Sequence, residues 1–322
     1  MTVKELIARS KAAQAAFAFA TQEQADAAAR AICKVVYDNA EKLGPMAAEE
    51  SRMGSEQDKI AKCRNKSALI WESLKDKKSC DIINRIEERR MIEVAKPVGV
   101  VASIIPSTNP VVTPMSNGAF ALKCRNSVIF APHPRAVKCT KLLVEMFRAE
   151  LKKLGLPEDL VLGLEEVSND LTSELMSAAD MVVATGGMGM VKAAYSSGKP
   201  AIGVGQGNVQ CIIDEDADIA DAVGKIIIGR AFDNGLICLG EQTVFVPEDK
   251  EAEFVAEMKK QGGYLVEGEE NVDKLREGLF PGGGAFSRVV VGMFADQVSD
   301  EIGLGAPKGT RVLFAKAKAL GA

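Results

Sequence analysis

Histidine is almost absent from this chain of 322 residues, in which His133 is the only one. A Ser-His-Asp triad or a Cys-His dyad would have to use this residue, and a metal site built from several histidines is excluded. Pro132 and Pro134 flank it and stiffen the segment into an extended conformation. We therefore interpret His133 as a loop or cofactor-wall residue in preference to a general base.

Closely spaced cysteine pairs are also missing. The chain has seven cysteines, and none of them belongs to a C-x-x-C motif. An odd number without such pairs argues against a zinc site and against a disulfide framework. We expect reduced thiols, a cytoplasmic protein and no bound metal.

Long apolar runs and a concentration of charge of one sign are lacking as well. Charged residues make up 26% of the chain, and acids and bases are interspersed at a net charge of −4. Without a basic stripe or a membrane-length segment, we expect neither nucleic acid nor a membrane as partner. Lys4, Glu5 and Arg9 interrupt any apolar core of a secretory signal. The length suggests two domains.

The first 80 or so residues predict helices. Thr2 with Glu5 and Thr21 with Gln24 have the spacing of capping boxes, and apolar residues recur at helical intervals after each. The pair at 44–45, Gly-Pro, predicts a break before a third helix.

From residue 98 onward, short apolar and β-branched runs alternate with helical segments, which is typical of a parallel, doubly wound α/β sheet. Ligands bind such sheets at the carboxyl ends of the strands. We expect residues 1–231 to form the N-terminal helices and a dinucleotide-binding domain, and residues 232–322 to hold part of a second α/β domain. The predicted strands cover residues 98–105, 127–131, 160–164, 181–184, 201–204 and 210–213.

Asn109 follows the first of these strands, in a Pro-Ser-Thr-Asn-Pro turn. A side-chain amide at this place is able to donate a hydrogen bond to a developing oxyanion, and removing one such donor typically costs about 10²–10³ in rate. From the turn alone, the simpler interpretation is that Asn109 caps the following helix.

Two further strand ends are rich in glycine. Thr185, Gly186 and Gly187 lead from a strand into a helix, and Gly205 lies in a Gly-x-Gly-x-Gly run. Glycines let a phosphate approach the backbone, and a helix N-terminus offers N–H groups to it. The pattern is not the G-x-G-x-x-G fingerprint, so close packing of helix on strand and a turn with left-handed residues stay open as alternatives.

Cys238 has the most informative surroundings of any cysteine in the chain. An Asn-Gly turn leads into a short apolar run that ends at the thiol, and Gly240 follows before a β-branched run resumes. This context suits a nucleophile held beside a tight backbone. A buried structural cysteine is the alternative that the local sequence leaves open.

Taken together, these segments resemble the aldehyde dehydrogenase family, and within it the CoA-acylating branch. The resemblance extends over nearly the whole chain and implies an aldehyde dehydrogenase-like fold, a doubly wound cofactor domain followed by a partial α/β catalytic domain. It rests on ordered matches at residues 106–110, 131–135, 184–200, 203–208 and 232–238.

The resemblance implies a role for each candidate residue. Cys238 would attack a small aldehyde, and Asn109 would stabilise the oxyanion. Hydride would pass to NAD, and coenzyme A would take the acyl group from the cysteine. The cofactor-binding residues implied are Pro132, His133, Thr185, Gly186, Gly187 and Gly205. The family also implies a homodimer or a higher homo-oligomer.

Three departures from the family pattern have consequences. Hydrolytic relatives carry a general-base glutamate at the position that we match to Gly203, and without it water is poorly activated to cleave an acyl-enzyme. His133 stands where such relatives often carry a lysine, so NADP stays open beside the preferred NAD. The family continues beyond Ala322, which indicates a chain that is incomplete at its C-terminus.

Several alternatives stay open at this point. A hydrolytic aldehyde dehydrogenase would release a free acid without coenzyme A. A truncated cofactor-binding fragment would keep the fold without turnover, and a generic nucleotide-binding module would explain the glycine turns but not the setting of Cys238.

Overall fold

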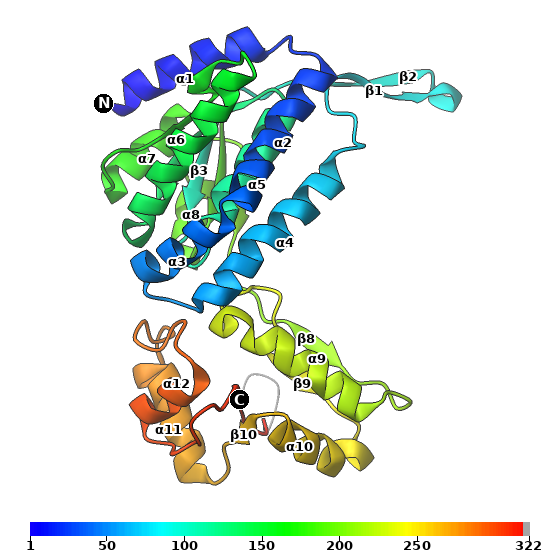
Figure 1. Cartoon of the computed structure of the whole chain (residues 1–322), viewed down its shortest axis with the longest axis vertical. Coiled ribbons are helices and arrows are strands. Elements are labelled where there is room, and N and C mark those ends of the chain that lie inside the picture. Colours follow the sequence, from blue (N-terminus) through cyan, green and yellow to red (C-terminus); the bar gives the residue numbers. More distant parts are fainter. Residues whose placement is uncertain (318–322) are drawn as a thin grey trace. The chain divides into compact units, whose positions relative to one another are not determined.

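The computed structural model describes residues 1–317. It contains two compact units: one comprises residues 1–51 and 56–206, and the other comprises residues 52–55 and the chain from Gly207 onward. Figure 1 traces both units along the sequence.

The first unit is built on a parallel five-stranded sheet with the order β5-β4-β3-β6-β7. The chain passes from β3 outward to β5, returns to the other side of β3 and continues to β7, so the predicted doubly wound sheet is confirmed. The strands are β3 (Val100–Ile105), β4 (Ser127–Pro132), β5 (Val161–Gly163), β6 (Met181–Thr185) and β7 (Ala201–Val204).

Alternate side chains of the central strands enter two separate cores, because successive residues of a strand face opposite sides of a sheet. In β3, Val101 and Ile105 join the core formed with α2, α5 and α6. Val100, Ala102 and Ile104 join the core formed with α1, α7 and α8. These helices are α1 (Val3–Phe17), α2 (Gln22–Asp38), α5 (Val112–Lys123), α6 (Val137–Lys153), α7 (Asn169–Ala178) and α8 (Met188–Tyr195).

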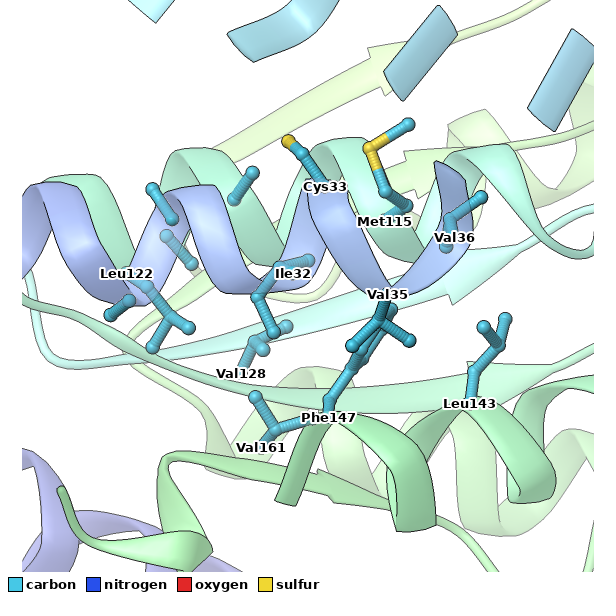
Figure 2. Packing of buried hydrophobic residues seen from close by; sticks show 14 of the residues in the cluster. Ile32, Cys33, Val35, Val36, Met115, Leu122, Val128, Leu143, Phe147 and Val161 are labelled. Carbon is cyan, nitrogen blue, oxygen red and sulfur yellow. The ribbon is translucent and has the colours of Figure 1, made fainter. Parts of the chain in front are cut away.

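The first of these cores is closely packed around aliphatic side chains and one phenyl ring. Ile32 and Val35 of α2 point toward Phe147 of α6, with Val128 and Val161 of the sheet beside them (Figure 2). Burying each such side chain is worth roughly 1.5–3 kcal/mol. This layer therefore holds the N-terminal helices on the sheet.

Two further helices, α3 (Ala40–Ser51) and α4 (Glu56–Leu74), pack on each other and on α2. The predicted break at residues 44–45 is wrong, since Pro45 lies inside α3. A Cβ atom on Gly44 would lie 2.6 Å from the side chain of Ile60, so the glycine lets α4 approach and tertiary packing maintains the helix. Both predicted capping boxes, at Thr2 and Thr21, are present.

An antiparallel hairpin joins α4 to the sheet strands. It consists of β1 (Asp81–Ile86) and β2 (Met91–Ala95), which pair with each other. In Figure 1 it extends away from the helices of its unit. Met91, Ile92 and Val94 are 52%, 53% and 47% exposed.

The second unit contains two parallel strand pairs, β8 with β9 and β10 with β11. Helix α9 packs on α10 around Val223, Ile227 and Phe254. The structure therefore places α9 within the second unit, whereas a boundary after residue 231 would leave it in the first. The elements are β8 (Gln210–Ile212), α9 (Ile219–Ala231), β9 (Thr243–Phe245), α10 (Glu251–Lys260), β10 (Gly263–Leu265), α11 (Glu269–Leu279), α12 (Ala295–Ile302) and β11 (Val312–Phe314).

Candidate functional site

The carboxyl ends of the parallel strands gather all the predicted site residues except Cys238. Asn109 follows β3, His133 follows β4, Gly186 and Gly187 follow β6, and Gly205 follows β7. Pro132 and Thr185 are the last residues of their strands. Because β3 is flanked by β4 and β6, the chain reverses its direction of winding at this strand, which is where doubly wound sheets bind ligands.

Asn109 is held by its side chain and by its backbone. Its Oδ1 accepts a hydrogen bond from Nζ of Lys62 at 2.8 Å, and its Nδ2 donates to Oγ1 of Thr108 at 3.3 Å. Its carbonyl accepts from the N–H of Thr113 at 3.2 Å, but no side chain caps α5, so Asn109 does not serve as a side-chain cap. One N–H of the amide has no partner within residues 1–317 and is available as a donor.

His133 lies on the exposed side of the strand end, whereas Pro132 is buried. The N–H of His133 donates to the carbonyl of Ile105 at 3.1 Å, which extends the pairing of β4 with β3. Its Nδ1 accepts from the N–H of Arg135 at 3.0 Å and caps the short turn before α6. His133 is therefore an exposed loop residue that borders the edge of the sheet.

The glycine turn after β6 leaves the N-terminus of α8 open. Gly187 occupies the N-cap position, and no side chain bonds to the helix there. A Cβ atom on Gly187 or Gly189 would meet no atom within 4 Å. Uncapped backbone N–H groups beside open space fit a phosphate group of a dinucleotide.

The glycines of β7 differ in what surrounds them. A Cβ atom on Gly203 would lie 2.7 Å from Val191 and 2.8 Å from Tyr195, and the Tyr195 hydroxyl accepts a hydrogen bond from the Gly203 N–H at 3.1 Å. Space for a larger side chain is therefore missing at the position matched to the hydrolytic glutamate. Neither Gly203 nor Gly205 has a positive φ, so the left-handed turn considered for this run is not formed.

Cys238 lies in the second unit, in the loop between α9 and β9, and is exposed. The N–H of Gly240 donates to the carbonyl of Ile237 at 3.2 Å, and a Cβ atom on Gly240 would lie 3.1 Å from the carbonyl oxygen of Gly229. The loop that bears the thiol thus packs directly on the last turn of α9. Exposure distinguishes Cys238 from a buried structural cysteine.

Three consecutive residues at the start of this loop have left-handed backbones: Asp233, Asn234 and Gly235, with φ of 49°, 53° and 71°. Oδ1 of Asp233 accepts from the N–H of Ser55 at 3.1 Å, and Nδ2 of Asn234 donates to the carbonyl of Gly292 at 2.9 Å. Left-handed backbones at non-glycine residues cost of order 1–3 kcal/mol each and persist where neighbouring contacts over-determine them. Here those contacts hold the turn that presents the cysteine loop.

A half-buried cation and a half-buried carboxylate flank the same loop. Burial lowers the pKa of the Arg230 guanidinium, while the charge of Glu241 acts in the opposite direction. Arg230 packs against Gly235, and Glu241 packs against Gly229, where a Cβ atom would lie 2.3 Å from Oε2. These glycines make room for the two charged groups on either side of Cys238.

The chain is similar to aldehyde dehydrogenases over most of its length. The model of the aldehyde dehydrogenase family matches residues 1–274. Succinate-semialdehyde dehydrogenase (acetylating) from Clostridium kluyveri is 47% identical over 321 residues, which cover 100% of this chain and 71% of the relative. This chain belongs to the aldehyde dehydrogenase family.

Solved structures agree with this assignment. An acetylating aldehyde dehydrogenase from Geobacillus thermoglucosidasius superposes with a TM-score of 0.93 at 38% identity, covering 98% of this chain and 70% of the other. A propionaldehyde dehydrogenase from Rhodopseudomonas palustris, with bound CoA and an acylated cysteine, gives 0.86 at 30% identity, covering 98% and 72%. The fold expected from the family resemblance is confirmed.

Two buried lysines that contact the turn after β3 were not among the predicted site residues. Lys59 and Lys62 of α4 are 3% and 4% exposed, and Nζ of Lys59 lies 3.5 Å from the Thr108 carbonyl. They share a helix face with Cys63 and Ser67, which are also buried. The spacing of Lys59 and Lys62, in phase with the buried face of the helix, is the sequence pattern that could have indicated these two lysines.

Two features are absent from the described part of the chain: a cluster of metal-binding side chains and a helix that could span a membrane. Within residues 1–317, no three or more His, Cys, Asp or Glu side chains are grouped so as to hold a metal ion. In the same range, no helix is both long enough and apolar enough to cross a membrane.

Proposed function

We propose that this chain carries the cofactor-binding domain and the nucleophile of a CoA-acylating aldehyde dehydrogenase that interconverts a small aldehyde and its acyl-CoA. The observation that carries the proposal is the exposed Cys238 in a braced loop, in a chain 47% identical to an acetylating relative. The acylated cysteine of the Rhodopseudomonas enzyme supports a covalent intermediate of the same kind.

In the proposed reaction, the thiolate of Cys238 attacks the aldehyde carbonyl and forms a carbon–sulfur bond, which leaves the carbonyl oxygen as an alkoxide. When bound, NAD would accept the hydride that leaves this carbon. The alkoxide then reforms a carbonyl and leaves a thioester on Cys238. Coenzyme A loses its thiol proton to solvent and its sulfur attacks the thioester carbonyl, so that acyl-CoA forms, the carbon–sulfur bond to Cys238 breaks and Cys238 returns to the thiolate.

Asn109 would stabilise the alkoxide by donating a hydrogen bond from Nδ2. Support comes from the amide itself, since Oδ1 is engaged by Lys62 and one N–H has no partner in the described part of the chain. A preorganised donor of this kind is typically worth about 10²–10³ in rate.

The open N-terminus of α8 would hold a phosphate of the dinucleotide. Thr185, Gly186, Gly187 and Gly205 would border it from the ends of β6 and β7, and Pro132 and His133 from the end of β4. We prefer NAD as the cofactor and keep NADP as the alternative.

Gly203 supports transfer of the acyl group to a thiol in preference to water. Tyr195 and Val191 occupy the space beside it, so no general base is built at this position. Without such a base, water attacks a thioester slowly, whereas a thiol nucleophile retains its advantage.

We also propose a cytoplasmic location and a homo-oligomer. None of the seven cysteines, all of which lie within residues 1–317, forms a disulfide bond, which suits a reducing compartment. The exposed apolar side chains of β1 and β2 favour association with a second copy.

The test is NADH formation from acetaldehyde or succinate semialdehyde with and without coenzyme A. We expect NADH formation that depends on coenzyme A, and its loss in Cys238→Ala with the affinity for NAD retained. Cys124→Ala is the control, because it removes another thiol and should leave turnover unchanged. Acid formation without coenzyme A would support the hydrolytic alternative, and loss of activity in both variants would contradict the role of Cys238.

A further inference from the structure

The contact between Lys62 and Asn109 decides which way the Asn109 amide faces. Lys62 is 4% exposed, and its Nζ lies 2.8 Å from Oδ1 of Asn109. A lysine ammonium carries three donors and no acceptor, so only the oxygen of an amide is able to bond to it. The nitrogen of the Asn109 amide is thereby turned away from Lys62.

We propose that Lys62 is a positioning residue that presents the Asn109 Nδ2 as the oxyanion donor and polarises its N–H bonds. The inference rests on the proposed function, because it assigns Lys62 a part in the same chemistry without any contact to substrate. Hydrogen bonds in a chain strengthen one another in a low-dielectric interior. A cation bonded to Oδ1 therefore makes the N–H groups of the amide better donors.

Among the contacts of the amide within residues 1–317, only that with Lys62 fixes this orientation. The Thr108 hydroxyl is able to donate or to accept, so its 3.3 Å contact with Nδ2 is compatible with either position of the amide. Lys59 contacts the carbonyl of Thr108 at 3.5 Å and supports the turn. Because the Lys62 ammonium can only donate, its contact with Oδ1 distinguishes the two possible orientations of the Asn109 amide.

The contact also supplies a hydrogen bond to the ammonium of a lysine that is buried in α4. Lys62 lies one turn before Lys66, which is half-buried, and in phase with Lys59 on the face that meets the turn after β3. Burying a lysine is costly unless its ammonium is hydrogen-bonded. A methionine would fill the same volume at lower cost, so the charge at this place requires a reason beyond packing.

The test compares Lys62→Met with Lys62→Arg, and uses Lys66→Met as the matched control on the same helix. We expect Lys62→Met to lower kcat about tenfold, less than the roughly 10²-fold loss expected for Asn109→Ala, because the amide stays but loses its fixed orientation. The KM for NAD should stay unchanged. Lys62→Arg keeps a donor-only cation and should recover most of kcat, and Lys66→Met should resemble the wild type.

A double-mutant cycle separates positioning from a general structural role. If Lys62 acts through Asn109, then Lys62→Met lowers kcat no further in the Asn109→Ala background. A second measurement does not depend on turnover: in protein labelled with ¹⁵N-asparagine, the Asn109 side-chain amide resonances, identified by their loss in Asn109→Ala, should shift in Lys62→Met and not in Lys66→Met.

Effects of Lys62→Met and Asn109→Ala that multiply, or amide resonances that do not respond, would overturn the inference while leaving the proposed function in place. Wild-type protein that forms no NADH with coenzyme A present would contradict the proposed function. In that case the role of Lys62 in catalysis would also be contradicted, even if the shifted amide resonances establish its contact with Asn109.

Discussion

Oδ1 of Asp233 accepts a hydrogen bond from the backbone N–H of Ser55 at 3.1 Å. Asp233 is fully buried, and its backbone has a φ of 49°. A Cβ atom on Gly54 would lie 1.9 Å from the same oxygen. One carboxylate therefore ties residues 52–55 to the turn that precedes Cys238, and the absence of a side chain at Gly54 makes this possible.

The first prediction concerns Gly54→Ala. The alanine would collide with Asp233, and it would also have to adopt a φ of +78°. We expect the free energy of unfolding to fall by about 3 kcal/mol, of which about 1–2 kcal/mol is the cost of the left-handed backbone. Urea unfolding measures the loss, and iodoacetamide labelling of Cys238 reports whether the loop has moved.

Gly303→Ala is the matched control for this prediction. Gly303 lies in the same unit with a φ of +72°, but a Cβ atom there would meet nothing within 4 Å. The free energy of unfolding of Gly303→Ala should fall only by the cost of the left-handed backbone, about 1–2 kcal/mol. Equal losses in the two variants would show that the contact with Asp233 does not matter.

The second prediction concerns the order in which the cysteines react. Burial raises the pKa of the Cys33 thiol to about 12, and burial with the nearby Glu50 raises the pKa of Cys139 as well. A raised thiol pKa lowers the thiolate fraction, to about 10⁻⁴ at pH 8 for Cys33. We expect iodoacetamide to label Cys238 in the folded protein well before Cys33 or Cys139.

Peptide mapping by mass spectrometry at pH 7, 8 and 9 checks this order. Cys124 is an internal control, because its residue is exposed while burial of its thiol raises its pKa. Labelling of Cys124 as fast as Cys238 would mean that exposure alone, without the setting of the loop, determines reactivity. Labelling of all sites should become equal in urea.

The third prediction concerns acid stability. Hydrogen bonds from Arg9 and Arg148 hold the pKa of Asp159 below its ordinary value. The unfolded chain therefore takes up a proton at this site before the folded protein does, so the stabilisation is complete above about pH 4–5 and is lost as the pH falls through the lowered pKa. Asp159→Asn removes this contribution.

Melting temperatures between pH 3 and pH 7 test the prediction. The difference between wild type and Asp159→Asn should be constant near neutral pH and should shrink below about pH 4. Glu166→Gln serves as the control, because Glu166 is an exposed carboxylate in the same unit. A difference that grows with acid would have the wrong sign and would contradict the role of the two arginines.

Strands β3 and β4 of the five-stranded sheet were predictable because every residue in them is buried, so both appear as largely apolar runs. The run at 98–105 became β3, and that at 181–184 became β6. The hairpin of β1 and β2 has no such signal, since its side chains lack a buried face. The strand at 210–213 was predicted correctly as a strand, but it pairs with β9 outside the main sheet.

The sequence by itself determined the fold class, the strand ends and the types of residue that follow them, because local periodicity and turn residues are written into neighbouring positions. Only the tertiary structure decided that Lys62 meets Asn109 and that Ser55 meets Asp233, since these contacts join positions 47 and 178 residues apart. Helix packing and chain crossover bring such groups together, and no local pattern encodes them. The orientation of the Asn109 amide is therefore a property of the folded protein.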